Sequence, residues 1–151
     1  MRTIQMLGLS YPHGDIMLKI IFSILLFLPS YSFACSCLHQ PLSKHVAGAK
    51  NIYVGVLTSS RIVEAKSDKE WPYVEGTIKV ETTIKGSPEK LETVRTGFGG
   101  GDCGIPMIVG RAYVIFFENE QHHIGSCGAS GLIERYQEKE FVDKLKALVN
   151  E

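Results

Sequence analysis

The sequence lacks the short motifs that mark many catalytic sites. Gly-x-Ser-x-Gly, His-Glu-x-x-His and Cys-x-x-Cys are all absent from its 151 residues. Residues 99–101 are three glycines, but no Lys-Ser/Thr pair follows them, so they do not match a phosphate-binding loop. We therefore expect a protein that is not an enzyme and that has no cofactor of its own.

An excess of one charge and a long apolar run are also missing. The chain has 16 Lys and Arg against 16 Asp and Glu, a balance that gives no basic surface for nucleic acid or anionic membranes. The apolar run at residues 20–28 has nine residues, which is too short to span a bilayer. We expect neither a nucleic-acid partner nor a membrane span.

The same apolar run has the length of the hydrophobic core of a signal peptide. Lys19 supplies positive charge before it. Ser32 and Ala34 then place small residues three positions and one position before Cys35, which is the pattern that signal peptidases cleave. We predict that residues 1–34 are a signal peptide and that the protein is exported, either to the periplasm or to the extracellular medium.

Two alternatives concern this leader. Residues 1–16 are long and polar for the start of a signal peptide, and a start at Met17 would give a compact leader. A lipoprotein signal, in which Cys35 becomes acylated, usually has an aliphatic residue three positions before the cysteine. Ser32 and Phe33 fit that pattern badly, so we favour ordinary cleavage before Cys35.

The predicted mature chain, residues 35–151, is long enough for one domain with one core. All four cysteines lie in it, and export delivers them to an oxidising compartment, so we expect disulfides. Cys35 and Cys37 lie too close in sequence to pair comfortably with each other. We expect both to form long-range bridges with Cys103 and Cys127, in a pairing that four cysteines alone leave open.

The pattern of apolar residues predicts a mostly β domain. The predicted strands are 51–63, 73–85, 91–96, 111–118 and 122–127, and the predicted helices are 44–50 and 134–150. The last helix is amphipathic, with Phe141, Leu145 and Leu148 at helical spacing. The fold that fits this order is an OB-fold-like five-stranded barrel with a short N-terminal helix and a C-terminal amphipathic helix.

Several segments together resemble a known family. They are "CSC" at residue 35, "NIYVGVL" at 51, "YVEGTIKVETTIKGSPEK" at 73, "DCGIPMIVGRAYVIFFE" at 102, "HHIGSCG" at 122 and the terminal helix. In this order they resemble the N-terminal inhibitory domain of the tissue inhibitors of metalloproteinases, within the wider family of netrin-like modules. The resemblance covers nearly all of residues 35–150. Its most specific element is Cys-x-Cys at a processed N-terminus, together with two distant cysteines.

The resemblance implies the bridges Cys35–Cys103 and Cys37–Cys127. It also implies an inhibitor of a zinc metalloendopeptidase, in which the free α-amine and the carbonyl of Cys35 coordinate the zinc of the target. A catalytic zinc keeps one position open for water, and the amine would displace that water. The metal would thus belong to the partner, and the cysteine contact would come from the backbone, since the thiols are bridged.

The resemblance also implies which residues touch the target. They are Cys35, Ser36, Cys37 and Leu38 at the N-terminus, and Gly101, Asp102 and Cys103 on a neighbouring ridge. Ser36 would enter the specificity pocket, and Cys37 with Leu38 would line the cleft. Because three glycines precede Asp102, we expect the ridge to be flexible.

Two other functions stay open. A netrin-like module of the same fold could bind a partner that is not a protease. Alternatively, the Cys-x-Cys pair could serve thiol redox or metal-handling chemistry, which predicts at least one reducible pair or a metal bound by free thiols. His122 and His123 are adjacent on a predicted strand, so we expect them to point to opposite faces and not to act as metal ligands. We expect a monomer.

Overall fold

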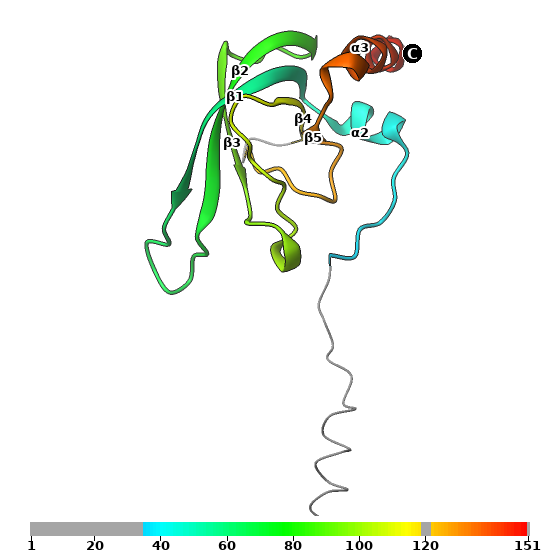
Figure 1. The fold of residues 1–151 in the computed structure, drawn as a ribbon. Coiled ribbons are helices and arrows are strands. Elements are labelled where there is room, and N and C mark those ends of the chain that lie inside the picture. The colour runs from blue at the N-terminus through cyan, green and yellow to red at the C-terminus, as the bar shows by residue number, and fades with distance from the viewer. Residues whose placement is uncertain (1–34, 119–121, 151) are drawn as a thin grey trace, which may run out of the picture. The chain divides into compact units, whose positions relative to one another are not determined.

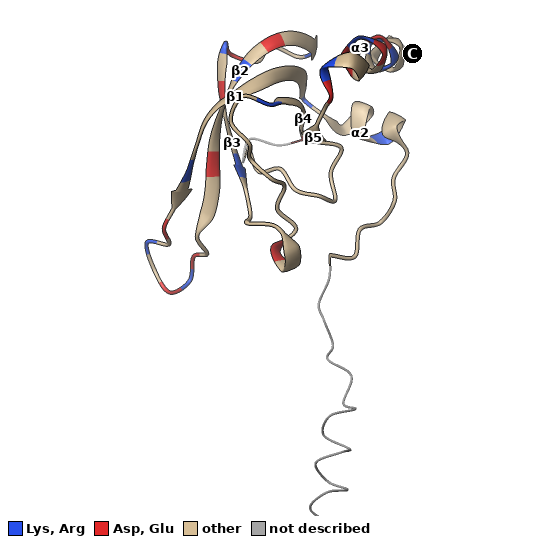
Figure 2. Cartoon of the chain, viewed as in Figure 1, with Lys and Arg blue, Asp and Glu red and all other residues tan. Residues whose placement is uncertain are grey.

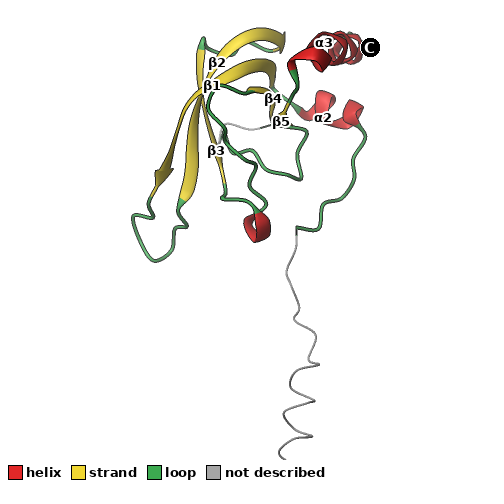
Figure 3. Cartoon of the chain, in the orientation of Figure 1, coloured by secondary structure: helices red, strands yellow, loops and turns green. Residues whose placement is uncertain are grey.

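The computed structural model describes residues 35–118 and 122–150. The predicted signal peptide, residues 1–34, lies outside the described residues. The elements of the described chain are α2 (Leu42–Gly48), β1 (Asn51–Val63), β2 (Tyr73–Lys85), β3 (Leu91–Thr96), a 3-10 helix (Gly100–Asp102), β4 (Ala112–Phe117), β5 (Gly131–Leu132) and α3 (Arg135–Val149). Figure 1 shows this order, and Figure 3 separates the strands from the helices.

The five strands form one antiparallel sheet in the order β3-β2-β1-β4-β5. Strands β1 and β2 make a long hairpin, whose pairing runs from Ile52 opposite Lys85 to Val63 opposite Tyr73. Its tip extends away from the helices in Figure 1. The predicted mostly β class with two helices is therefore confirmed. In the described part of the chain the sheet is open, and the five strands do not close a barrel.

A single parallel bridge extends the sheet beyond β3. The backbone N–H of Arg95 donates to the carbonyl of His122 at 2.8 Å, and the N–H of Ile124 donates to the carbonyl of Arg95 at 2.8 Å. The strand predicted over residues 122–127 is reduced to this bridge. His122 has a φ of 53° in the left-handed region, which interrupts extended backbone.

The sheet is covered on both faces, because alternate residues of its central strands enter two apolar clusters. One cluster joins Ile52 and Val114 to α2 and α3 through Val46 and Leu145. The other lies on the opposite face, where β1 and β4 contribute the residues that alternate with the first set: Tyr53, Leu57, Tyr113, Ile115 and Phe117. Ile78 of β2, Val94 of β3 and the loop residues Ile105 and Ile124 complete it. Strand β4 is buried along its whole length, which explains why its sequence, "AYVIFF", is uniformly apolar.

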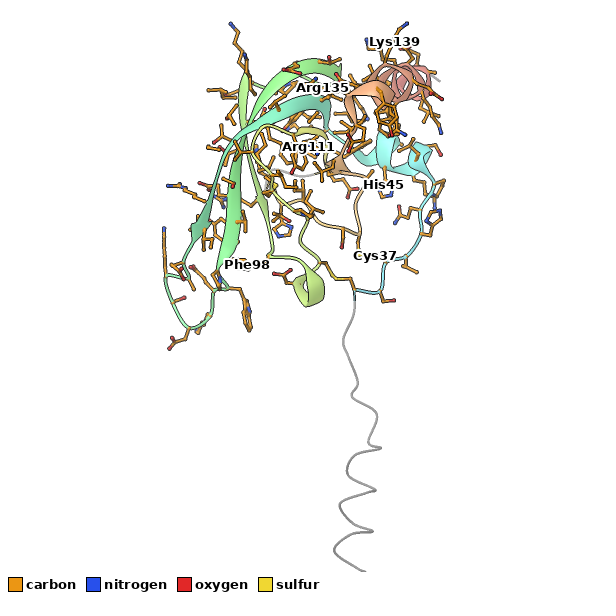
Figure 4. All side chains as sticks on the ribbon, in the orientation of Figure 1. Cys37, His45, Phe98, Arg111, Arg135 and Lys139 are labelled. Atoms are coloured by element: carbon orange, nitrogen blue, oxygen red, sulfur yellow. A yellow bond between two sulfur atoms is a disulfide. The ribbon has the colours of Figure 1, made fainter. Side chains whose placement is uncertain are left out.

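Two polar contacts fix the helices to β2. Lys85 Nζ donates to the carbonyl of Val46 at 2.8 Å, near the C-terminal end of α2, where a cation offsets the helix dipole. Arg135, at the start of α3, donates to Glu81 Oε2 at 2.8 Å and to Glu138 Oε2 at 2.8 Å. Figure 4 shows Arg135 where α3 meets the sheet.

Candidate functional site

Two disulfides attach the segment before α2 to the rest of the domain. Cys35 is bonded to Cys103 with a Cα–Cα distance of 5.6 Å, and Cys37 is bonded to Cys127 with a Cα–Cα distance of 5.1 Å. This is the pairing that the resemblance implies. All four cysteines of the sequence are used, so the described chain offers no free thiol. Figure 4 shows Cys37 on the segment that leads into α2.

The stapled segment presents its side chains to solvent. Ser36 and Cys37 are exposed, and Leu38 has 87% of its surface exposed. Cys35 is partly covered, and its Sγ lies 3.2 Å from the carbonyl oxygen of Gly100. Because that sulfur carries no hydrogen, this is a van der Waals contact rather than a hydrogen bond. The structure thus brings residues 35–38, the first segment predicted to contact a target, against the second such segment, residues 101–103.

That second segment, residues 97–104, is called the ridge below. The carboxylate of Asp102 accepts hydrogen bonds from three of its backbone N–H groups: Phe98 at 2.6 Å, Gly99 at 2.8 Å and Gly104 at 3.1 Å. These bonds, that from Phe98 foremost, hold the pKa of Asp102 below its usual range. The ridge is therefore braced by its own side chain, contrary to the flexibility that its glycines predict.

Glycine is required in the ridge because its two ends come close together. A Cβ at Gly104 would lie 2.2 Å from the carbonyl carbon and oxygen of Gly97, and a Cβ at Gly97 would lie 2.5 Å from the Asp102 carboxylate. Gly99 and Gly100 have φ values of 96° and 68°, which side chains disfavour. The sequence "GFGGGDCG" therefore encodes a tight turn in which the glycines allow close backbone approach and Asp102 supplies the hydrogen bonds that hold the turn.

A hollow of about 390 Å³ lies beside Cys103 and Cys127. His45 and Glu118 line it, with Nδ1 of His45 3.7 Å from Oε1 of Glu118, and that buried nitrogen has no hydrogen-bond partner among the described residues. Within residues 35–118 and 122–150, no three His, Cys, Asp or Glu side chains gather as they would around a metal ion. The hollow therefore offers at most a pair of ligands.

The two adjacent histidines differ in environment. The ring of His122 packs against the ring of Phe117 in a tilted arrangement, with 4.6 Å between ring centres and 54° between ring planes. Its Nδ1 lies 3.0 Å from the carbonyl oxygen of Thr93. His123 is exposed. Their roles in the structure are thus packing of the loop against β3 for His122 and a solvent-facing position for His123.

A larger groove, of about 750 Å³, was not anticipated from the sequence. Its walls come from the hairpin tip, from β3 and from the loop at residues 122–123, and they include Trp71, Tyr73 and Arg95. Residues from three distant segments leave no local motif. The available signal was the single tryptophan, placed in an otherwise charged loop.

The helices of the described ranges are all too short or too polar to cross a bilayer. Comparison with protein-family models and with curated proteins finds no match to this chain. Fold and site together define its class: a mostly β domain whose exposed N-terminal segment is held by two disulfides against a braced ridge.

Proposed function

We propose that this chain is an exported, netrin-like domain that inhibits a zinc metalloendopeptidase, in the manner of the tissue inhibitors of metalloproteinases. After cleavage before Cys35, its new α-amine and the Cys35 carbonyl would chelate the zinc of the target. Ser36, Cys37 and Leu38 would occupy the cleft. Gly101 and Asp102 would contact its rim.

The observation that carries this proposal is the attachment of residues 35–38 at two points. A chelating terminus must be fixed before it binds, because ordering a free chain end costs affinity. The bridges from Cys35 and Cys37 remove most of that freedom, while Ser36 and Leu38 stay exposed for contact. If the two disulfides served only to stabilise the fold, the side chains of Ser36 and Leu38 would not need to be exposed.

The chemistry of the α-amine suits the role. Its ordinary pKa is near 8, so about a tenth of it is neutral at pH 7, and zinc favours that form further. The nearest carboxylate on the ridge, that of Asp102, is engaged with three backbone N–H groups. It therefore braces the ridge and is not offered to the metal as a free ligand.

The topology is compatible with an OB-fold-like barrel. A barrel closes when the two edges of its sheet meet, and the edge strands here are β3 and β5. The parallel bridge joins Arg95 on β3 to His123, on the chain between β4 and β5, so we propose that it marks the closure of the barrel. Two disulfides in the mature part fit an oxidising compartment, the periplasm or the extracellular medium.

The test uses residues 35–151 with Cys35 as the authentic first residue, assayed against a panel of zinc endopeptidases. The matched control carries one extra alanine before Cys35. We expect the authentic protein to inhibit, and the extended one to be weaker by about 100-fold or more, because the chelate is lost. Circular dichroism and unreduced mass should be the same for both.

Equal inhibition by the two proteins would overturn chelation by the terminus. Absence of inhibition by either would favour the alternative function, a netrin-like module that binds a partner other than a protease. The alternative of thiol redox or metal handling predicts at least one readily reducible pair, or free thiols that bind a metal, in place of the two inert bridges that the inhibitor requires.

A further inference from the structure

The groove between the hairpin tip and β3, called the aromatic groove below, is built differently from the N-terminal site. The side chains used in the argument are Trp71, Tyr73, Thr93, Arg95, His122 and His123. Its volume of about 750 Å³ lies within the range of small-ligand sites, and it combines aromatic rings with a few polar groups as such sites do. The ridge contributes one edge through Asp102.

Arg95 is held in place by its neighbours, and in the described part of the chain its Nη atoms are available for hydrogen bonds. Its Nε lies 3.4 Å from Glu75 Oε2, and its guanidinium lies 5.2 Å from the centre of the Tyr73 ring. Among residues 35–118 and 122–150, neither of its Nη atoms donates a hydrogen bond. Glu75 is already paired with Arg61 at 2.6 Å, so the charge of Arg95 is only partly offset. A positioned guanidinium of this kind suits a carboxylate.

Trp71 and Tyr73 give the groove its apolar surface. Trp71 has 87% of its surface exposed, and an indole so exposed is typical of a contact surface. The C–H face of a sugar ring stacks on an aromatic face, because its weakly positive hydrogens meet the negative π-cloud. Thr93 and the rings of His122 and His123 add groups that can donate to or accept from hydroxyls.

Two other kinds of ligand fit less well. An added peptide strand would need a free edge on β3, but the N–H and the carbonyl of Arg95 are both bonded to the 122–124 segment. A polyanion would need a track of basic residues. Figure 2 shows basic and acidic residues interspersed along the hairpin tip, and one arginine lines the groove.

We propose that the aromatic groove binds a sugar acid, that is, a pyranose ring that carries a carboxylate, as in an oligosaccharide of uronic acids. The carboxylate pairs with the Nη atoms of Arg95. The ring stacks on Trp71 or Tyr73, and its hydroxyls meet Thr93 and the histidines. This site adjoins the ridge at Asp102, but it does not use the proposed zinc-chelating terminus and does not depend on it.

The experiment titrates residues 35–151 with tri-galacturonate and follows the fluorescence of Trp71, which is the only tryptophan in the sequence. The matched ligand is the methyl ester of the same trisaccharide, which keeps the rings and removes the charge. We expect a saturable change with tri-galacturonate, and binding weaker by about tenfold or more for the ester. Equal binding of the two would overturn recognition of the carboxylate.

Two variants locate the site. Arg95→Gln should weaken binding of tri-galacturonate by about tenfold or more, since the charge-assisted pair is lost, and it leaves Glu75 paired with Arg61. Arg135→Gln makes the same change on α3, away from the hairpin tip in Figure 4, and should bind as the parent does. Unchanged binding by Arg95→Gln, or the absence of any saturable signal, would overturn the proposal.

A third ligand tests the role of the ring. Succinate carries carboxylates without a pyranose, and it should give no saturable change in Trp71 fluorescence at the concentrations at which tri-galacturonate saturates. Equal binding of succinate would show that the groove binds anions without recognising a sugar, and it would overturn the proposal that the pyranose ring is recognised. The protein extended by one alanine before Cys35 should bind tri-galacturonate unchanged, so failure here and failure of protease inhibition are distinguishable.

Discussion

At the scale of single residues, Asp102 decides the shape of the ridge. Glycine loses more conformational freedom on ordering than any other residue, so four glycines between Gly97 and Gly101 should favour a loose loop. The Asp102 carboxylate opposes this with three hydrogen bonds to backbone N–H groups. Bonds to an ionised acceptor are stronger than neutral ones, and their strength depends on that charge.

The first prediction follows from the lowered pKa of Asp102. A carboxyl whose pKa is lower in the folded state stabilises the fold above its unfolded pKa, which for aspartate is about 3.9. That contribution is lost as pH falls through the folded-state value. We expect Asp102→Asn to melt below the parent at pH 7, with the difference shrinking as the pH falls below about 3.9. Thermal denaturation followed by circular dichroism measures it.

Asp143→Asn, at an exposed aspartate on α3, is the matched control, because it removes one carboxylate and leaves the hydrogen bonds of the ridge in place. Glu75 also has a lowered pKa, because of its hydrogen bond to Arg61, but it is present in all three proteins and cancels in the comparison. A gap between parent and Asp102→Asn that stayed constant from pH 7 to pH 2.5 would show that the carboxylate charge is not what braces the ridge.

At the scale of elements, the alternation of apolar residues predicted the long strands well. Strands β1, β2 and β3 have the predicted bounds, and β4 and α3 lie within one residue of them at each end. These elements bury one face or both faces, so the pattern of buried positions determines where their apolar residues occur in the sequence. The strand predicted over residues 122–127 was wrong, because β propensity reflects the side chains of the segment itself. The left-handed φ of His122 and the parallel bridge depend instead on partners far away in sequence.

The second prediction concerns α3. Leu145 is fully buried in the cluster that joins α3 to α2 and the sheet. Leu145→Ala should lower the free energy of unfolding by about 3 kcal/mol, from lost apolar burial and the cavity that remains. Lys139→Ala, on the exposed side of the same helix, should change it by less than about 0.5 kcal/mol. Urea denaturation of both variants measures these values, and equal losses would contradict the packing of α3 described here.

At the scale of the whole molecule, two disulfides tie the first described residues to segments that follow 68 and 90 residues later in sequence. Each closure of such a loop restricts the unfolded chain by an amount worth about 4 kcal/mol when considered alone. This is close to the net stability of a small domain.

Cys-x-Cys and the distant cysteines were visible in the sequence, but the bracing of the ridge and the aromatic groove were not, since both depend on how distant backbone segments meet.

The last prediction joins the staple to the proposed function. Zinc chelation requires a free amine on Cys35, so we predict that the protein is exported and that its mature form begins at that residue. Forming the two bridges removes two hydrogens each, so its intact mass should lie four hydrogens below that of the reduced chain. N-terminal sequencing and mass spectrometry, before and after reduction, measure both. An acylated or extended terminus would rule out the chelating amine while leaving the disulfides intact, whereas free thiols would contradict the staple that positions it.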